Sequence, residues 1–180
     1  TGVGKSELVN ALAGAEVVST GRARPTTLRP TLVCRPDLTP AMLGIPTESV
    51  EVEKRDLPSL ANLVLIDCPD PDTTEAQQSP GTNLARLRQV LPHCDVLLVV
   101  STQQKYRSAR VAEELAAAAS GARLVFVQTH ADQDQDVRED WRAMLLPHYD
   151  PGHIFLVDSP AALADAQSGR EPRGEFAGLA

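Results

Sequence analysis

The sequence has few aromatic residues, widely spaced cysteines and no long apolar run. Phe, Trp and Tyr make up only 3% of its 180 residues. The three cysteines, Cys34, Cys68 and Cys94, are odd in number and far apart, so we expect reduced, mostly buried thiols and a cytoplasmic setting rather than a disulfide framework. No apolar stretch approaches the roughly 20 residues of a membrane span. These absences argue against a disulfide-stabilised secreted scaffold and a membrane-spanning helix within these residues.

Positive charge is also in short supply. Asp and Glu number 24 against 17 Lys and Arg, which gives a formal net charge of −7. An acidic chain is a poor default binder of nucleic acid or of anionic membranes. We therefore expect no nucleic-acid partner, and membrane association only through segments outside these residues. A content of 42% hydrophobic and 23% charged residues is typical of a soluble globular protein, and the length fits one domain, residues 1–180.

Apolar runs alternate with helical patterns through most of the chain. The runs read as buried strands at 62–67, 94–101, 122–129 and 153–159. Helical patterns cover 6–14, 83–91, 108–121 and 137–146. Strands that alternate with helices predict βαβ units, and hence an α/β fold with a mainly parallel sheet and helices on both faces.

Two regions are less regular. Residues 30–36 and 48–57 each predict a strand, and the second is polar enough for the edge of a sheet, while 37–47 reads as a loop. The tail, 168–180, predicts a loop followed by the start of a helix.

The opening stretch, TGVGKSEL, contains the triplet Gly4-Lys5-Ser6 just before a helical pattern. These are the last three positions of the phosphate-loop pattern GxxxxGK[ST]. Glycine lets backbone N–H groups curl around phosphates, the Lys ammonium reaches the outer phosphates, and the Ser hydroxyl binds magnesium. The helix that follows directs its positive N-terminal end at the anion. A plain helix start is the alternative interpretation of the triplet alone.

Three other segments place polar residues directly after apolar strands. Asp67 ends the run at 62–67, where nucleotide hydrolases hold magnesium, usually through water. Asp132 follows the run at 122–129, where a carboxylate can accept two hydrogen bonds from a guanine edge that adenine cannot offer. Ser159 ends the run at 153–159 and Pro160 follows it, at a place where backbone N–H groups can contact a base. A loop-capping Asp, a helix cap and a simple turn are the respective alternatives.

The order of these segments resembles the G domain of translation-factor-class P-loop GTPases, especially the Era-like and dynamin-like branch. TGVGKSELVNAL is similar to its phosphate loop and first helix, RARPTT to its first switch, and IDCPD, THAD and DSPAAL to its three later motifs. The resemblance implies a three-layer α/β fold. It also implies that the first strand and the first glycine of the loop lie before Thr1, so that the domain is incomplete at both ends.

The resemblance further implies GTP hydrolysis with Mg²⁺, and a switch role with GTP and GDP as ligands. Catalytic residues would be Lys5, Thr27 and Asp67, with Thr26 as the alternative to Thr27. Metal ligands would be Ser6, Thr27 and Asp67. Nucleotide-binding residues would be Gly2, Gly4, Lys5, Ser6, Glu7, Thr129, His130, Asp132, Ser159 and Pro160. An effector or a second copy of the chain would bind through the switch loops.

Three positions depart from the family pattern. Asp70 replaces a glycine whose amide would contact the terminal phosphate, His130 replaces a lysine that packs along the base, and Pro71 stands where related proteins carry a water-orienting glutamine. These departures keep two alternatives open: a nucleotide-binding regulatory module with negligible turnover, and a P-loop ATPase or kinase. The run DQDQD at 132–136 lacks the glycine and the final glutamate of a calcium loop, so that interpretation is set aside.

Overall fold

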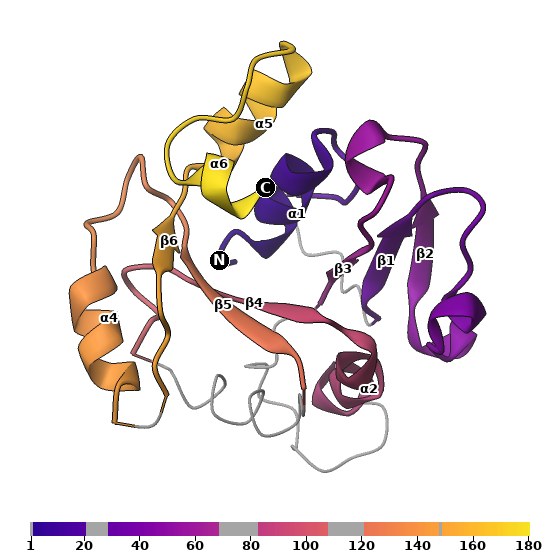
Figure 1. Cartoon of the computed structure of the whole chain (residues 1–180), viewed down its shortest axis with the longest axis horizontal. Helices are drawn as coiled ribbons and strands as arrows, with labels where there is room; N and C mark the ends of the chain where they lie inside the picture. The colour runs from indigo at the N-terminus through magenta and orange to yellow at the C-terminus, as the bar shows by residue number, and fades with distance from the viewer. Residues whose placement is uncertain (1, 21–28, 69–82, 108–120, 148) are drawn as a thin grey trace.

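The computed structural model describes residues 2–20, 29–68, 83–107, 121–147 and 149–180 (Figure 1). Its strands are β1 (Thr31–Cys34), β2 (Glu51–Lys54), β3 (Leu65–Asp67), β4 (Val96–Ser101), β5 (Arg123–Gln128) and β6 (Ile154–Leu156). Its α-helices are α1 (Lys5–Ala13), α2 (Asn83–Val90), α4 (Arg138–Leu145), α5 (Ser159–Gln167) and α6 (Phe176–Leu179). Short 3₁₀ helices are η1 (Pro40–Leu43), η2 (Thr47–Ser49), η3 (Pro58–Leu60) and η4 (Leu91–His93).

Every strand predicted from the sequence is present, and α1, α2 and α4 lie in segments predicted as helical. Helix α5 was not predicted from the sequence. The segment predicted as a loop at 37–47 contains η1 and the start of η2. The tail is a loop followed by the short helix α6, as predicted. The helix predicted at 108–121 lies, up to residue 120, outside the described residues.

The described strands form two three-stranded sheets, β2-β1-β3 and β4-β5-β6 (Figure 1). The strands β4, β5 and β6 are parallel, as the alternating pattern predicted. In the other sheet β1 runs parallel to β2 but antiparallel to β3, with Leu32 opposite Ile66. The polar strand β2 lies at a sheet edge, as expected. Three of the four described strand pairings are therefore parallel, and the pairing of β1 with β3 is the exception to the predicted mainly parallel arrangement.

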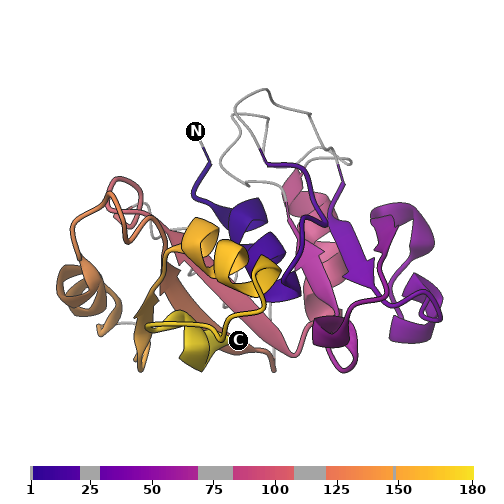
Figure 2. The same cartoon turned by 90° about the horizontal axis from the view of Figure 1, so that it is seen from above.

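Helix α1 packs against both sheets (Figure 2). Leu8 and Ala11 pack with Val127 of β5 and with the residues around α5. Val9 and Ala13 turn to the other sheet and pack with residues such as Val33 of β1. The helix starts after Gly4 and ends at Gly14, whose φ of 72° is the left-handed conformation that favours glycine at a helix end. One amphipathic helix thus shields a face of each sheet from water.

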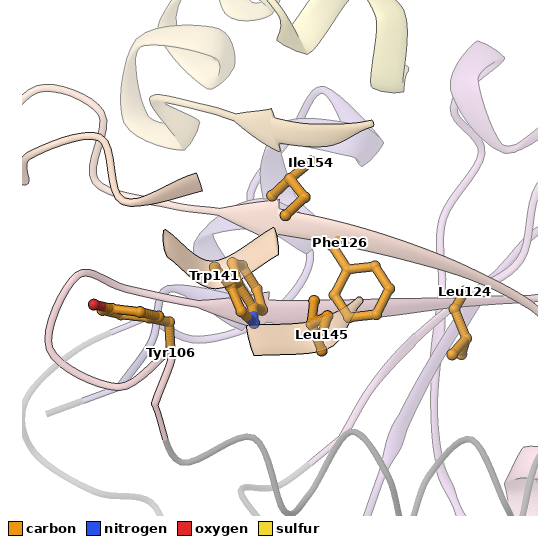
Figure 3. Packing of buried hydrophobic residues seen from close by; sticks show 6 residues of the cluster. All are labelled: Tyr106, Leu124, Phe126, Trp141, Leu145 and Ile154. Atoms are coloured by element: carbon orange, nitrogen blue, oxygen red, sulfur yellow. The ribbon is translucent and has the colours of Figure 1, made fainter. Parts of the chain in front are cut away.

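Helices also cover the opposite faces. Trp141 and Leu145 of α4 pack against Phe126 of β5 (Figure 3), and the Phe126 and Trp141 rings meet edge to face with centroids 5.6 Å apart. On the other sheet, Val90 of α2 packs against Leu32 and other β1 residues. Side chains alternate across a strand, so β5 directs Phe126 to α4 and its neighbour Val127 to α1. Both faces of β5 are buried, which explains its continuous apolar run.

All three cysteines are free thiols, as their spacing predicted. Cys34 is buried in β1, while Cys68 and Cys94 are half-buried. Burial raises the pKa of the Cys68 thiol to about 12, and the neighbouring Cys94 and Asp67 add to the rise. A thiol with such a pKa stays protonated at neutral pH and is a poor nucleophile.

Candidate functional site

The predicted phosphate end of the site is the start of α1. Gly4 has a φ of 76°, and a Cβ built there would lie 3.4 Å from atoms of Glu7, Thr129 and His130. Both facts favour glycine at this position. No side chain caps the helix start. The first backbone N–H groups of a helix have no partner inside the helix, so they suit an anion such as a phosphate. Lys5, the first helical residue, adds positive charge there.

Ser6 and Asp67 meet although 61 residues separate them. The Ser6 hydroxyl donates a 2.6 Å hydrogen bond to Oδ2 of Asp67, which ends β3. Burial raises the pKa of Asp67, while the hydrogen bond from Ser6 and the charge of Lys5 oppose that rise. The structure therefore brings together the hydroxyl of Ser6 and the carboxylate of Asp67, which were predicted from separate motifs, next to Lys5.

The Ser6–Asp67 pair suits Mg²⁺ better than a metal ion that protein ligands surround completely. Mg²⁺ keeps several waters and is held by one or two carboxylates together with substrate phosphates. Within the part of the chain that the structure describes, no three or more His, Cys, Asp or Glu residues gather as a metal cluster. One carboxylate and one hydroxyl at a phosphate-binding helix start fit the ion, and Ser6 and Asp67 would hold it.

Thr129 links the two ends of the site. It is 1% exposed, and its hydroxyl lies 2.8 Å from the carbonyl of Val3 and 3.2 Å from that of Ser101. The hydroxyl has one proton, so the two carbonyls share it as acceptors. The sequence named Thr129 as a nucleotide contact; the structure places its hydroxyl between the phosphate loop and the carboxyl end of β4.

His130 lies beside the phosphate loop. Its φ of 59° falls in the left-handed region, which His adopts more readily than most residues with a side chain. Its Nε2 lies 3.8 Å from Oε2 of Glu7, and its carbonyl accepts hydrogen bonds from the backbone N–H groups of Gln133 and Asp134. The turn thus directs the imidazole toward the start of α1.

Asp132 and the start of α5 are the predicted base end of the site. The Asp132 side chain is exposed and accepts a 2.8 Å hydrogen bond from Gln133. The backbone N–H of Ala131 donates to the carbonyl of Val157, which brings the loop after β5 next to the loop after β6. Asp158 caps α5 by accepting from Ala161 N–H.

Ser159 and Pro160 form the first turn of α5. Ser159 is 2% exposed, and its hydroxyl has no hydrogen-bond partner among the described residues. Pro160 suits the first turn, where a backbone N–H has no helical partner in any case. Of the other predicted residues, Gly2 is exposed ahead of α1, while Thr27, Asp70 and Pro71 lie outside the described residues.

Comparison with known protein families identifies the family of this chain. The model of the 50S ribosome-binding GTPase family matches residues 1–130. The chain belongs to this family. The match includes the start of α1, Asp67, Thr129 and His130, and it ends two residues before Asp132. No curated protein matches the chain.

Family membership makes this chain a P-loop GTPase domain, whose ligands are guanine nucleotides. It favours GTP over the ATPase interpretation of the phosphate loop. Among the described residues of this GTPase domain, no helix is long and apolar enough to cross a membrane.

Sequence patterns did not identify two glutamines of this GTPase domain, Gln103 and Gln128, as residues of the site. Gln128 ends β5 with 0% exposure, and Gln103 follows β4; both make hydrogen bonds to the loop that carries Asp132. A signal for Gln128 exists in the sequence, because a polar residue ends the otherwise apolar run LVFVQ. Gln103 carries no such signal, since it lies in the polar stretch STQQK.

The carboxylates of the run DQDQD each have a different partner. Asp132 accepts from Gln133, Asp134 from the backbone N–H of Gln103, and Asp136 pairs with Arg138. Helix α4 begins at Arg138, so these carboxylates precede the helix. Their separate partners agree with setting the calcium loop aside.

Proposed function

We propose that this GTPase domain binds GTP and GDP with Mg²⁺ and hydrolyses GTP to GDP and phosphate, as a nucleotide-dependent switch of the Era-like and dynamin-like branch. The observation that carries the proposal is the 2.6 Å bond between Ser6 and Asp67 at the start of α1. It joins two predicted magnesium ligands next to the predicted phosphate-binding lysine. Family membership supplies the guanine nucleotide.

Each residue has a defined task in the proposed reaction. The backbone N–H groups around Gly4 and the start of α1, together with Lys5, hold the phosphates. Ser6 and Thr27 would ligate Mg²⁺ and Asp67 would hold it through water, and the bound ion would supply positive charge that neutralises the phosphates. Water attacks the terminal phosphate, the bond to the β-phosphate oxygen breaks, and GDP leaves with that oxygen. Positioning and electrostatics supply the rate, so no covalent intermediate forms.

Asp132 selects the base in this proposal. Its exposed carboxylate accepts from the N1–H and the 2-amino group of guanine, groups that adenine does not present. Ser159 and Pro160 border the base at the start of α5, and His130 packs where the family pattern has a lysine. Gly2 and Glu7 flank the phosphates.

The finer fold that we propose is a three-layer G domain in which β2-β1-β3 and β4-β5-β6 belong to one sheet. Helix α1 packs on both sheets, which supports this arrangement.

A switch with negligible turnover is the second candidate, and the contact between His130 and Glu7 favours it. A histidine 3.8 Å from a carboxylate replaces the lysine of the family pattern, so the charge beside the phosphate loop differs from that pattern. Single-turnover GTP hydrolysis, measured with and without candidate effectors, separates the two functions. A rate equal to that of uncatalysed GTP in every case would leave only the switch.

The test of the nucleotide assignment is a titration of the intact protein with GDP, ADP and XDP in the presence of Mg²⁺. We expect GDP to bind more tightly than ADP by about 10⁴-fold, because a polar site left unpaired rejects the wrong base strongly. Asp132→Asn replaces an acceptor by a donor and should move the preference from GDP to XDP.

Asp56→Asn is the matched control, because Asp56 is an exposed aspartate in the segment after β2. It should keep the preference for GDP. Tighter binding of ADP than of GDP, or an Asp132→Asn variant with unchanged base choice, would contradict the proposed function. A cytoplasmic location and partners at the switch loops remain predictions of the sequence.

A further inference from the structure

The loop between β5 and α4, residues 129–137, is held by a buried glutamine that the proposed reaction does not use. Gln128 is 0% exposed and ends β5. Its Nε2 donates a 2.7 Å hydrogen bond to the carbonyl of Gln135, and its Oε1 accepts a 3.1 Å hydrogen bond from the N–H of Val137. One side chain therefore closes the loop on itself, from the last residue of the strand to the residue before α4.

A second glutamine holds the same loop from the turn after β4. The Oε1 of Gln103 accepts a 3.0 Å hydrogen bond from the N–H of Gln135. In return, the N–H of Gln103 donates a 3.0 Å hydrogen bond to Oδ2 of Asp134. This reciprocal pair fixes two successive residues of the loop to the carboxyl end of the neighbouring strand.

These contacts fix the loop on both sides of Asp132. On the near side, Ala131 N–H bonds to the carbonyl of Val157, and on the far side the two glutamines hold residues 134–137. Asp132 lies between the fixed points with its own side chain exposed. A recognition group is useful only when its position is held to within about 0.5 Å, and surrounding hydrogen bonds supply that precision.

We propose that Gln103 and Gln128 are positioning residues that set the guanine selectivity of this domain by fixing Asp132; the inference rests on the proposed function. Neither side chain needs to contact the nucleotide. Loss of either leaves the Asp132 carboxylate present but free to sample positions that no longer match both donors of guanine. Selectivity for the 2-amino group of the base then falls before binding of the phosphates is lost.

The test measures binding of GDP and of inosine diphosphate, which lacks the 2-amino group, to the intact protein and to Gln128→Leu and Gln103→Ala. In each variant we expect GDP affinity to fall roughly tenfold, as loss of one or two hydrogen bonds predicts. Affinity for inosine diphosphate should fall less, so the ratio of the two affinities should decrease. A loss of general stability alone leaves that ratio unchanged.

Gln135→Ala is the matched control, because the loop uses only the backbone of Gln135 in these contacts and its side chain is exposed. It should keep the ratio of the unmodified protein. If Gln128→Leu does not fold, Gln103→Ala decides, since Gln103 is only half-buried. An unchanged ratio in the folded variants overturns the inference. Failure of the unmodified protein to bind any guanine nucleotide overturns the proposed function, and the inference with it.

Discussion

The phosphate end and the base end of the site are held in different ways. At the phosphate end, a glycine and the backbone at the start of α1 provide the binding groups, and one side-chain bond, from Ser6 to Asp67, ties them to β3. At the base end, the loop around Asp132 is held by side chains of Gln103, Gln128 and Thr129. The predicted binding groups of the phosphate end therefore come largely from one local segment, which the Ser6–Asp67 and Thr129–Val3 bonds hold in place, whereas the base end depends on contacts between three strand ends.

The largest effect is expected at the phosphate end. Lys5→Ala removes the charge that faces the phosphates and should weaken GTP binding on the order of 100-fold, from the roughly 3 kcal/mol of charge-assisted hydrogen bonding. Equilibrium titration with GTP measures it. Lys54→Ala makes the same change of charge on the exposed edge strand β2 and should bind normally. Equal losses in both variants would show that net charge matters and not the place of Lys5.

Thr129→Val should affect both ends of the site, because the Thr129 hydroxyl lies between the phosphate loop at Val3 and the end of β4 at Ser101. The substitution keeps the side chain's shape and removes the hydroxyl that bonds to Val3 and Ser101. The Val3 carbonyl loses this donor, while the Ser101 carbonyl keeps the backbone N–H of Thr129, so the free energy of unfolding should fall by about 1–3 kcal/mol. Denaturant unfolding measures this change. Thr47→Val, at an exposed position in η2, is the control; a similar loss there would remove the special role of Thr129.

Ser6→Ala tests the phosphate end alone, through the dependence of nucleotide binding on Mg²⁺. We expect chelation of Mg²⁺ to weaken GDP binding in the unmodified protein, and Ser6→Ala to reduce that difference by roughly fivefold, the value of one hydrogen-bonding ligand. Titration with GDP, with and without a chelator, gives the result. Ser168→Ala removes an exposed hydroxyl that bonds within the α5 end and should retain the full dependence. An unaltered dependence in Ser6→Ala would argue against Ser6 as a ligand.

The smallest effect on nucleotide binding is expected from a substitution of Asp165. This residue lies in α5, the helix whose start belongs to the predicted base end. This carboxylate is 3% exposed and bonded to Arg173 and Arg170. Hydrogen bonds from Arg173 and then from Arg170 hold its pKa below the usual value, against the opposing effect of burial. A carboxyl with a lower pKa in the folded state stabilises the fold above its unfolded pKa of about 3.9, and this contribution is lost as the pH falls.

Asp165→Asn should therefore show a weaker decrease of melting temperature than the unmodified protein as the pH is lowered from about 6 to about 3. Thermal melting across that range measures it, and nucleotide selectivity at neutral pH should change little. Asp56→Asn should keep the full acid sensitivity. Identical pH profiles for Asp165→Asn and the unmodified protein would show that this ion pair does not control acid stability.

Much of the fold follows from short patterns. The strands β3 to β6 appear as apolar runs because both faces of such strands are buried, and α4 appears because Trp141 and Leu145 recur at helical spacing. The pairing of β1 with β3 in antiparallel register does not follow from either strand's own sequence. Four or fewer residues per strand carry too little periodicity to choose a partner or a direction.

The local parts of the site follow from sequence patterns alone: a helix that starts after Gly4, ends at Gly14 and carries Lys5 and Ser6 in its first turn. Backbone conformation, residue type and spacing act over a few residues, so a short motif is enough to specify them. Only the tertiary structure decided that Ser6 meets Asp67 and that Gln128 and Gln103 hold the loop of Asp132. Such contacts join segments whose distance depends on how the strands pair and on how α1 packs across both sheets, and no local pattern encodes that distance.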